Sequence, residues 1–552
     1  MSFQKHSSST YNSGMAERTR EPRIAQRIPS VSLIDRGLIA AFAGAIIASA
    51  LVLYATISQP LLEAHGFRQT QTAITAYWFI HDGFTLAYQT PIAGYPWKIP
   101  LEFPFFQALV ASIAGLTHLP LDEVGRALSY VFFVATLVPV ALICRSLNLG
   151  YRVFLIFGTL YVLSPHYLFW GRTFLIESTA TFFGVATIAA LLPFFLGRRV
   201  TLYRALAVVL LATLAILQKI TTGLPIVMVL VGCLAAAFLM HLMRNDRNAL
   251  KVPAFGIALL TIPVLVGLGW TYFTDLIKAQ SDLGKLWTSA ELRAWNFGTL
   301  SQRFSGDLFR GVIWTRSLRV NAGSYIGLAV LGFFYVRETR RPRIVIAAVA
   351  AALFLFPLFL FTNLHIIHEY YQTSTTIFVI FLLALAFDYL AIHSLPRVFL
   401  LAFALVLLSN LANFRQVYWP IAHASITPEK HPTLAIASML REQTSPDARI
   451  LVYGFSMSSE IAYYSQRKSA TVPDDYPMLD EPLKKPARFF GSDKVGALVV
   501  CPTANGADPS EAEIKRFVQA NGPFRETAVD KCRVFIASDG SPPRGSVQRT
   551  GP

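Results

Sequence analysis

The sequence predicts an all-α polytopic membrane protein that carries a small α/β domain outside the membrane. Of its 552 residues, 54% are hydrophobic and only 14% are charged, whereas soluble domains carry ~25% charged residues. Long apolar stretches recur up to residue 413, and short strands alternate with helices after it. Together these observations exclude a soluble enzyme, a disordered chain and a collagen-like chain.

Residues 1–36 are polar and basic and lack periodicity, so we expect a disordered cytoplasmic tail. The region 37–413 then holds apolar segments near the ~20 residues that a helix needs to cross the hydrocarbon. We expect eleven spans, although the division around residue 220 is open. They are residues 37–58, 126–146, 151–169, 174–196, 203–218, 223–243, 253–273, 322–336, 343–362, 374–393 and 397–413.

The distribution of basic residues favours a cytoplasmic N-terminus. If each span crosses once, 19 Lys and Arg residues fall in the tail and the short loops on that side, against 12 on the other side. Such an excess is typical of cytoplasmic loops. We therefore attribute the net charge of +16 to these loops and to lipid headgroups rather than to nucleic acid binding.

The long loops all fall on the outer side, which indicates that the functional surface lies there. Residues 59–125 form the first outer loop, and within it residues 102–118 predict a partly apolar helix lying on the membrane. Residues 274–321 form the second outer loop. Eleven crossings also place the C-terminal region outside the cytoplasm.

Residues 414–538 predict a small α/β domain with a largely parallel sheet, because strands and helices alternate. The expected strands are 449–453, 495–500 and 532–537, and the expected helices are 432–443, 457–466 and 510–520. Cys501 and Cys532 lie at strand ends in a compartment that permits disulfides, so we predict a bridge between them. Residues 539–552 are expected to be disordered.

The first outer loop carries the strongest chemical signal. It reads HGFRQTQTA at 65–73, HDGF at 81–84 and YPWKIPLEFPFFQ at 95–107. An enzyme that handles an anionic lipid needs cations for the phosphate and a carboxylate to activate an acceptor hydroxyl. The alternative is a solvated interfacial loop with snorkelling basic side chains and an aromatic belt.

Two further signals lie at the outer ends of spans. In WGRTFLIESTATFF, Arg172 is at the outer mouth and Glu177 lies about a turn and a half into an apolar helix. An ionisable group at that depth is functional by default, the alternative being an internal ion pair between Arg172 and Glu177. Lys219, in QKITTGLP, could equally be a phosphate ligand or a snorkelling anchor.

The segment TNLHIIHEYYQ at 362–372 follows an apolar run and contains His365, His368, Glu369, Tyr370 and Tyr371. The two histidines share a helix face, but the segment lacks the HExxH pattern of a zinc site. We therefore predict a polar, aromatic substrate wall and no metal site. GFSMS at 454–458 lacks the closing glycine of the G-x-S-x-G motif, so a hydrolase is disfavoured.

With these motifs in place, the chain resembles the GT-C superfamily. More narrowly it is similar to bacterial polyprenyl-phosphate-sugar-dependent glycosyltransferases, namely the protein O-mannosyltransferases, the lipid A aminoarabinose transferases and the lipopolysaccharide galacturonosyltransferases. The resemblance rests on HGFRQTQTA, EFPFFQ, GRTFLIES, QK and HEYYQ, in this order between residues 35 and 415. It implies eleven to thirteen spans, an active site between the first outer loop and the bilayer, and a lipid-linked monosaccharide donor.

The chain departs from the family pattern at Gln71, where related sequences have an aspartate. An amide cannot accept a proton as a general base. Either Glu102 or Asp82 supplies the carboxylate, or the chain is inactive or catalyses a different reaction. We favour Glu102, which follows Lys98 by four residues and could act together with it, and Asp82 is the second choice.

The expected reaction inverts the anomeric carbon, and the polyprenyl phosphate leaves as an anion. The leaving phosphate would be stabilised by cations of the outer face. The expected substrate-binding residues are Arg68, Gln69, Gln71, Lys98, Arg172, Glu177, Lys219, His365, His368, Glu369, Tyr370 and Tyr371. No nucleotide is needed, and a divalent cation is the one cofactor left open.

The expected partners are the polyprenyl-phosphate-linked sugar, an acceptor outside the cytoplasm and the bilayer. The resemblance implies a bacterial inner membrane with the site facing the periplasm. Two other classes compete. A transporter or flippase of lipid-linked saccharide would show matched broken helices, and only one break is visible, at 218–223. A noncatalytic scaffold leaves Glu177, Lys219 and the HEYYQ segment unexplained.

Overall fold

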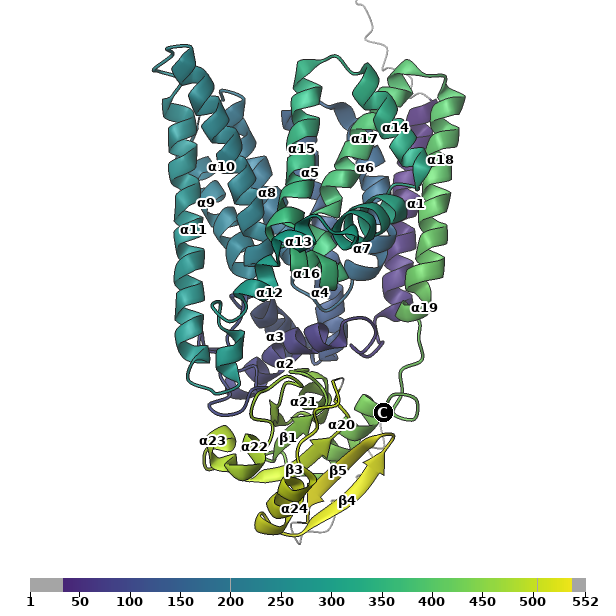
Figure 1. Ribbon diagram of the computed structural model, residues 1–552. Helices are drawn as coiled ribbons and strands as arrows, with labels where there is room; N and C mark the ends of the chain where they lie inside the picture. The colour runs from purple at the N-terminus through teal and green to yellow at the C-terminus, as the bar shows by residue number, and fades with distance from the viewer. Residues whose placement is uncertain (1–32, 199, 504, 539–552) are drawn as a thin grey trace, which may run out of the picture.

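The computed structural model describes residues 33–198, 200–503 and 505–538. They form a bundle of apolar helices with a smaller α/β domain at one end, as Figure 1 shows. This confirms the predicted fold class. The expected disordered tails lie outside the described residues, except that residues 33–36 form the first turn of a helix.

Each predicted span overlaps a helix of the bundle. Eight helical segments among the described residues are long and apolar enough to cross a membrane. Three others that match predicted spans, α6, α9 and α14, are shorter, so the count of eleven stays a prediction. The bundle helices are α1 Leu33–Thr56, α4 Leu121–Ala135, α5 Leu137–Ser146, α6 Gly150–Val162, α7 Pro165–Trp170, α8 Glu177–Phe195, α9 Leu202–Gln218, α10 Ile220–Met243, α11 Lys251–Lys278, α14 Tyr325–Arg337, α15 Arg341–Leu360, α17 Thr376–His393 and α18 Pro396–Asn413.

The helices α9 and α10 are separated by a single extended residue, Lys219, whose φ and ψ are −158° and 103°. The chain reverses there so tightly that a Cβ on Gly223 would lie 2.5 Å from the backbone of Ala215. Only glycine permits this approach of two helix ends. The break therefore sets the Lys219 side chain at the end of the bundle.

The end of the bundle that faces the C-terminal domain is built from short helices of the outer loops. Helix α2 and helix α3 lie across this end in Figure 1. Helix α3 corresponds to the helix predicted at 102–118 and is slightly shorter. Not all short elements lie at this end, since α13 and α16 lie about halfway along the bundle in Figure 1. The short elements are α2 Gly66–Asp82, α3 Phe105–Thr117, the 3₁₀-helices η1 Gly284–Trp287 and η3 Glu369–Ser374, the π-helices η2 Asp307–Arg319 and η4 Phe414–Tyr418, α12 Arg293–Phe297, α13 Leu300–Arg303, α16 Thr362–Ile367 and α19 Trp419–Ala422.

The C-terminal domain has a five-stranded mixed sheet with the order β2-β1-β3-β5-β4. Its elements are α20 Pro432–Gln443, β1 Arg449–Tyr453, α21 Glu460–Ser465, β2 Lys468–Thr471, α22 Glu481–Lys484, α23 Pro486–Phe490, β3 Val495–Val500, α24 Glu511–Ala520, β4 Phe524–Val529 and β5 Cys532–Ala537. The three predicted strands are confirmed with the same bounds, and β2 and β4 were not expected.

The prediction of a largely parallel sheet was wrong. Strand β1 runs parallel to β2 and β3, but β5 runs antiparallel to both β3 and β4. The physical reason is the unpredicted strand β4, which is joined to β5 by only Asp530 and Lys531. A connection of two residues can make only an antiparallel hairpin.

The first outer loop completes the edge of this sheet. The backbone N–H groups of Ser469 and Thr471 in β2 donate to the carbonyls of Pro91 and Ile92 at 2.9 and 2.8 Å. An edge strand presents unpaired backbone groups that must be covered. Trp97 and Ile99 of the same loop are buried in the core of the domain with Leu451 and Leu498.

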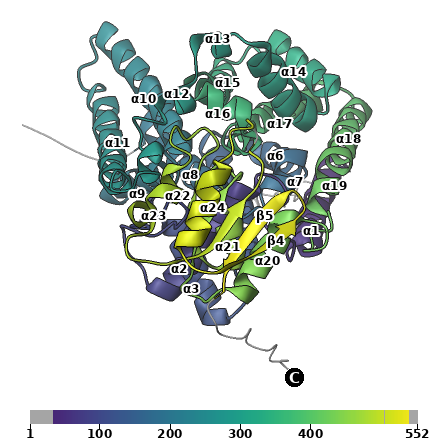
Figure 2. The ribbon, with the colours of Figure 1, turned by 60° about the horizontal axis from the view of Figure 1, so that its bottom comes forward.

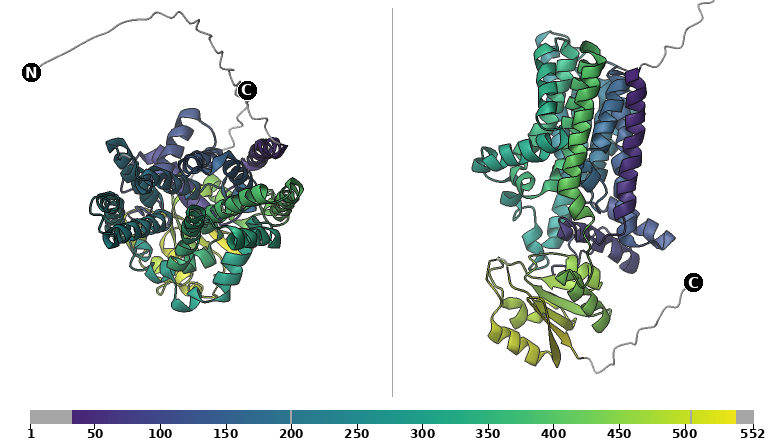
Figure 3. Two further views of the ribbon diagram at one scale, coloured as in Figure 1. Left: turned by 90° about the horizontal axis from the view of Figure 1, so that it is seen from above. Right: turned by 90° about the vertical axis from the view of Figure 1, so that its right-hand side faces the viewer.

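The domain therefore sits on the end of the bundle that carries α2 and α3. Viewed toward that end, it covers the middle of the bundle, with α11 to one side and α18 to the other (Figure 2). The side view of Figure 3 shows the same separation into a helical bundle and one capping domain.

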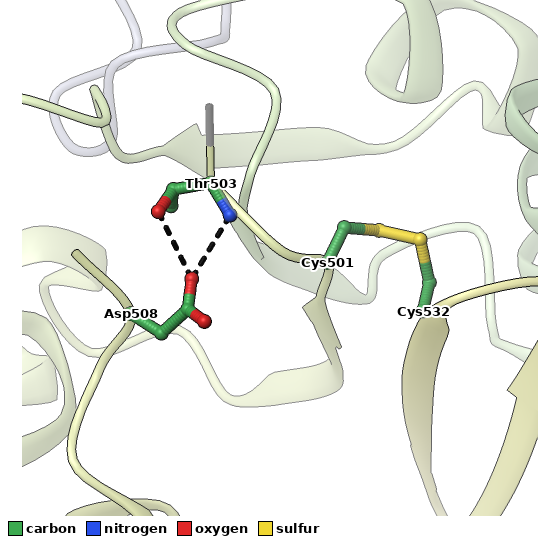
Figure 4. The surroundings of a disulfide bond; sticks show 4 residues. All are labelled: Cys501, Thr503, Asp508 and Cys532. Carbon is green, nitrogen blue, oxygen red and sulfur yellow. Dashed lines mark hydrogen bonds between the residues drawn. A yellow bond between two sulfur atoms is a disulfide. The ribbon is translucent and has the colours of Figure 1, made fainter. Parts of the chain in front are cut away.

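The predicted bridge between Cys501 and Cys532 is confirmed by a disulfide in the structure, shown in Figure 4. Val500 is paired with Arg533 across the antiparallel strands β3 and β5, so the next residues, Cys501 and Cys532, face each other. The loop after Cys501 is fixed by Asp508, whose carboxylate accepts hydrogen bonds from the backbone N–H and the hydroxyl of Thr503.

Thiol labelling of the denatured, unreduced protein is expected to modify Cys144 and Cys233 and to leave Cys501 and Cys532 unlabelled. Reduction should then expose both. Since the bridge closes a loop with a sequence separation of 31, its loss should destabilise the domain by about 3–4 kcal/mol. Labelling of all four cysteines before reduction would rule the bridge out.

Candidate active site

Helix α2 carries the polar residues of the first outer loop into a buried position. His65 precedes it in the left-handed region, with a φ of 49°. The side chains of Arg68 and Gln71 are buried, although polar side chains usually face water. A buried charge must be paired or hydrogen-bonded, so the partners of Arg68 define what this site is.

The guanidinium of Arg68 joins two of the predicted residues. It donates one hydrogen bond to the side-chain oxygen of Gln71 and another to the carboxylate of Glu102. Burial alone lowers the pKa of Arg68, but the nearby carboxylates, Glu102 first, raise it well above its usual range. The amide at position 71 thus fixes the cation that holds Glu102.

Glu102 is held in place through its own backbone and that of its neighbours. The Tyr88 hydroxyl donates to the Glu102 carbonyl at 2.7 Å and accepts from the Leu101 N–H at 2.7 Å. The indole N–H of Trp270 in α11 donates to the Leu101 carbonyl at 3.0 Å. The carboxylate is therefore positioned by both the loop and the bundle, while 21% of its side chain remains accessible.

Lys219 and Glu177 form a second ion pair between the start of α10 and the start of α8. Both side chains are almost completely buried. The Lys219 ammonium also lies 3.8 Å from the ring centre of Tyr371 and 4.9 Å from that of Tyr370, a favourable cation–π geometry. One oxygen of the Glu177 carboxylate has no hydrogen-bond partner among the described residues.

The HEYYQ segment forms an aromatic wall over these pairs, and its predicted role in substrate binding stays a prediction. The His65 ring lies 5.4 Å from that of His368 and 5.1 Å from that of Tyr370. Burial first, and then nearby cations including Lys219, lower the pKa of His365 and of His368 to about 3. Both imidazoles are therefore neutral at physiological pH.

Arg316 of η2 is a third cation at this wall, and the sequence analysis missed it. Its guanidinium donates to the carbonyls of His365 and Ile366 at 3.1 and 2.8 Å. Its positive charge contributes to lowering the pKa of His65 and His368. The nearby arginines of the same segment, Arg310 and Arg319, are exposed, so the sequence does not distinguish Arg316 from them.

A second buried network lies beside the site and corrects one expectation. Arg172 does not pair with Glu177; it contacts Glu63, at 2.9 Å, together with Arg126 at 2.5 Å. Burial raises the pKa of Glu63, but the two arginines more than offset this and lower it. Glu63 and Arg126 are charged residues next to apolar ones. This contrast is the sequence feature that could have identified them.

Several predicted residues lie apart from Glu102. Asp82 is at the far end of α2, about 20 Å from Arg68 at 1.5 Å per residue, and pairs with Lys468 at 3.0 Å. Lys98 is exposed and forms no ion pair among the described residues. The cation that contacts Glu102 is Arg68 rather than Lys98. Glu369 accepts from the Tyr418 hydroxyl, and Gln69 binds the backbone at Ala64 and Phe174.

The C-terminal domain fastens the N-terminal end of α2. The Ser459 hydroxyl lies 2.7 Å from that of Thr70 and donates to the Phe67 carbonyl at 2.8 Å. The hydroxyl groups of Tyr463 and Tyr464 both donate to the carboxylate of Asp122 in α4. These contacts hold the turn that contains His65 and Arg68 between the domain and the bundle.

Glu460 lies in the same interface, with its carboxylate against Gly66, where an added Cβ would meet it at 2.7 Å. Burial raises the pKa of Glu460 to about 7. The folded protein therefore binds a proton more tightly than the unfolded chain does, and its stability falls as the pH rises from about 4.5, the ordinary value, through 7.

We expect the melting temperature of the wild type to fall between pH 5 and pH 8 by more than that of Glu460→Gln, whose amide stays neutral. Circular dichroism melting of the detergent-solubilised protein measures both. Glu442→Gln, at an exposed position of the same domain, is the control and should follow the wild type. An equal pH dependence in all three proteins would show that Glu460 does not titrate in this range.

No family model and no curated protein sequence matches the chain. Among solved structures it is similar to ArnT from Cupriavidus metallidurans bound to undecaprenyl phosphate, with a TM-score of 0.60, 12% identity, and coverage of 92% of this chain and 99% of that one. It is also similar to the oligosaccharyltransferase AglB from Archaeoglobus fulgidus in complex with an inhibitory peptide and a dolichol-phosphate, with a TM-score of 0.56, 13% identity, and coverage of 93% and 76%.

A third similar structure is the arabinofuranosyltransferase AftD from Mycobacteria, with a TM-score of 0.54 and 15% identity. It is much longer, since the match covers 91% of this chain but 40% of that one. The fold shared with these structures extends over both the bundle and the capping domain, because the matches cover 92% and 93% of this chain. The chain is a multi-pass membrane protein.

Proposed function

We propose that the protein is a membrane glycosyltransferase that moves a monosaccharide from a polyprenyl-phosphate donor to an acceptor outside the cytoplasm. The observation that carries the proposal is the junction of Arg68, Glu102, Glu177 and Lys219 beneath an aromatic wall. The similarity in fold to structures holding undecaprenyl phosphate or a dolichol-phosphate supports it.

The charges of the site suit a sugar phosphodiester. Arg68, Lys219 and Arg316 supply three positive charges, and Glu102 and Glu177 supply two negative ones. Lys219 can donate three hydrogen bonds and Arg68 five, so both keep donors for phosphate oxygens after binding their carboxylates.

In the proposed reaction, an acceptor hydroxyl attacks the anomeric carbon and Glu102 takes its proton. The bond between the anomeric carbon and the phosphate oxygen breaks, and the polyprenyl phosphate leaves with the electron pair. Arg68 and Lys219 stabilise the negative charge that the leaving phosphate gains. Attack opposite to the leaving group inverts the anomeric carbon. Tyr370, Tyr371 and His368 offer faces on which a sugar ring can pack.

Gln71 has a supporting role in this mechanism. Because its side-chain oxygen accepts from Arg68, it fixes the guanidinium that holds Glu102. An aspartate at this position would pair with Arg68 and compete with Glu102. The departure from the family pattern therefore fits a relocated base rather than an inactive protein.

The proposal is tested with purified protein in lipid vesicles and polyprenyl-phosphate donors that carry a hexose, a pentose or a uronic acid. Transfer releases polyprenyl phosphate and glycosylates an acceptor extracted from the cell surface. A chelator arm measures the contribution of a divalent cation. Movement of intact donor across the vesicle membrane, with no release of polyprenyl phosphate, would instead support a transporter.

We propose that the site faces the periplasm of a bacterial inner membrane, because 19 basic residues fall on the opposite side. An alkaline phosphatase fused after residue 538 is expected to be active, and the same reporter fused at residue 245 is expected to be silent. The reverse pattern would overturn the orientation. The disulfide of the C-terminal domain supports it, since disulfides persist in oxidising compartments.

A further inference from the structure

The end of the bundle opposite the C-terminal domain contains a cavity of about 800 Å³. Its lining includes Leu196, His241 and Arg341, which lie where α8 and α10 end and where α15 begins. On α15 its lining extends from Arg341 to Leu353, about 18 Å at 1.5 Å per residue. That depth corresponds to one leaflet, half of the ~30 Å hydrocarbon core.

The interior of the cavity is lined by apolar side chains, among them Phe157, Leu230, Val345 and Phe378. A cavity lined in this way has no polar partners for ordered water. Leaving its volume empty would forfeit the contacts of every side chain around it. The occupant must therefore be hydrocarbon, and in a membrane the available hydrocarbon is a lipid chain.

The arginines at this end of the cavity indicate the charge of the lipid headgroup. Three arginines follow each other closely at the start of α15, and two are neutralised: Arg340 by Glu338, with two contacts at 2.9 Å, and Arg343 by Asp388 at 2.7 Å. Arg341 lines the cavity and has no ion pair among the described residues. Its charge is available to a lipid, and basic pockets between helices at the cytoplasmic side bind anionic headgroups.

We propose that this cavity is a binding site for one anionic phospholipid, with its acyl chains between α10 and α15 and its phosphate at Arg341. Arg341 lies at the end of the bundle away from Glu102 and Lys219, so a phosphate bound there does not reach the proposed catalytic residues. The lipid would fill the space between the helices and hold them at the spacing that the outer site requires.

Native mass spectrometry of the detergent-solubilised full-length protein tests this proposal. With added phosphatidylglycerol, the wild type should retain one lipid, and with phosphatidylcholine it should retain much less. Arg341→Gln should weaken retention ~5-fold or more, the effect of removing one basic residue at a headgroup. Arg340→Gln is the matched control and should bind as the wild type does, because that charge is already neutralised.

A second pair of variants tests the acyl-chain site separately. Ala237→Trp fills the cavity from α10 and should abolish retention, whereas Ala235→Trp, on the same helix outside the lining, should not. Melting curves confirm that each variant is folded. Equal effects of the two arginine variants, or equal retention of both phospholipids, would overturn the proposal. Preferential retention of polyprenyl phosphate would assign the cavity to the donor instead.

Discussion

Replacing Glu102 by glutamine is expected to lower the rate of sugar transfer by ~10²–10⁴-fold, the usual contribution of general-base assistance. The amide cannot take the proton of the acceptor hydroxyl. It can still accept the hydrogen bond from Arg68 that the carboxylate accepts now, so the loop should keep its position. Turnover should therefore fall while donor binding is nearly unchanged.

The measurement is release of polyprenyl phosphate from purified donor at matched protein concentration. Asp82→Asn is the control, because Asp82 pairs with Lys468 far from the site, and it should retain most of the activity. Glu177→Gln should differ from both, since it leaves Lys219 without its counter-charge and changes donor binding. If Glu102→Gln keeps more than about a tenth of wild-type activity, Glu102 is not the general base.

The second large effect is expected at Glu63. Its carboxylate is the counter-charge of both Arg126 and Arg172, and all three side chains are at most 1% exposed. Glu63→Gln would leave two buried cations without the carboxylate that neutralises them. Breaking a buried ion pair by removing one member costs ~3–5 kcal/mol, so we expect a large fall in the free energy of unfolding.

Thermal or denaturant unfolding in a fixed detergent measures this change. Glu291→Gln is a suitable control, since Glu291 is exposed in the second outer loop and has no ion pair among the described residues. It should be within ~0.5 kcal/mol of the wild type. A Glu63→Gln protein as stable as this control would mean that Arg126 and Arg172 find other partners or water.

The fold was largely predictable because its signals are local. Each apolar run of spanning length overlaps a helix of the bundle. The strands 449–453, 495–500 and 532–537 are buried apolar segments. The missed strand β2, KSAT, is short and polar, and β4, FRETAV, alternates on an exposed edge. Neither has the apolar signal of a buried strand, and missing β4 led to the wrong sheet direction.

The candidate site was predictable in its residue types but not in its pairs. Glu177 stood out because an ionisable group inside an apolar helix is costly, Glu102 because the amide of Gln71 cannot act as a base, and Lys219 because it lies at the end of a span. Their partners could not be inferred, since Arg68 reaches Glu102 across 34 residues and Lys219 reaches Glu177 across 42. The expectation that Lys98 supports Glu102 followed sequence proximity, which the loop does not preserve.

The pairing of β2 with residues 91–92 ties the order of folding to the order of synthesis. The first outer loop emerges from the ribosome early, but its partner strand lies 378 residues later in the chain. Contacts at such separation can form only after translation is nearly complete. A chain that stops before residue 468 would insert its helices yet lack the strand against which the first outer loop is ordered. Incomplete chains would therefore reach the membrane without a complete active site. They would be inactive without the action of a separate inhibitor.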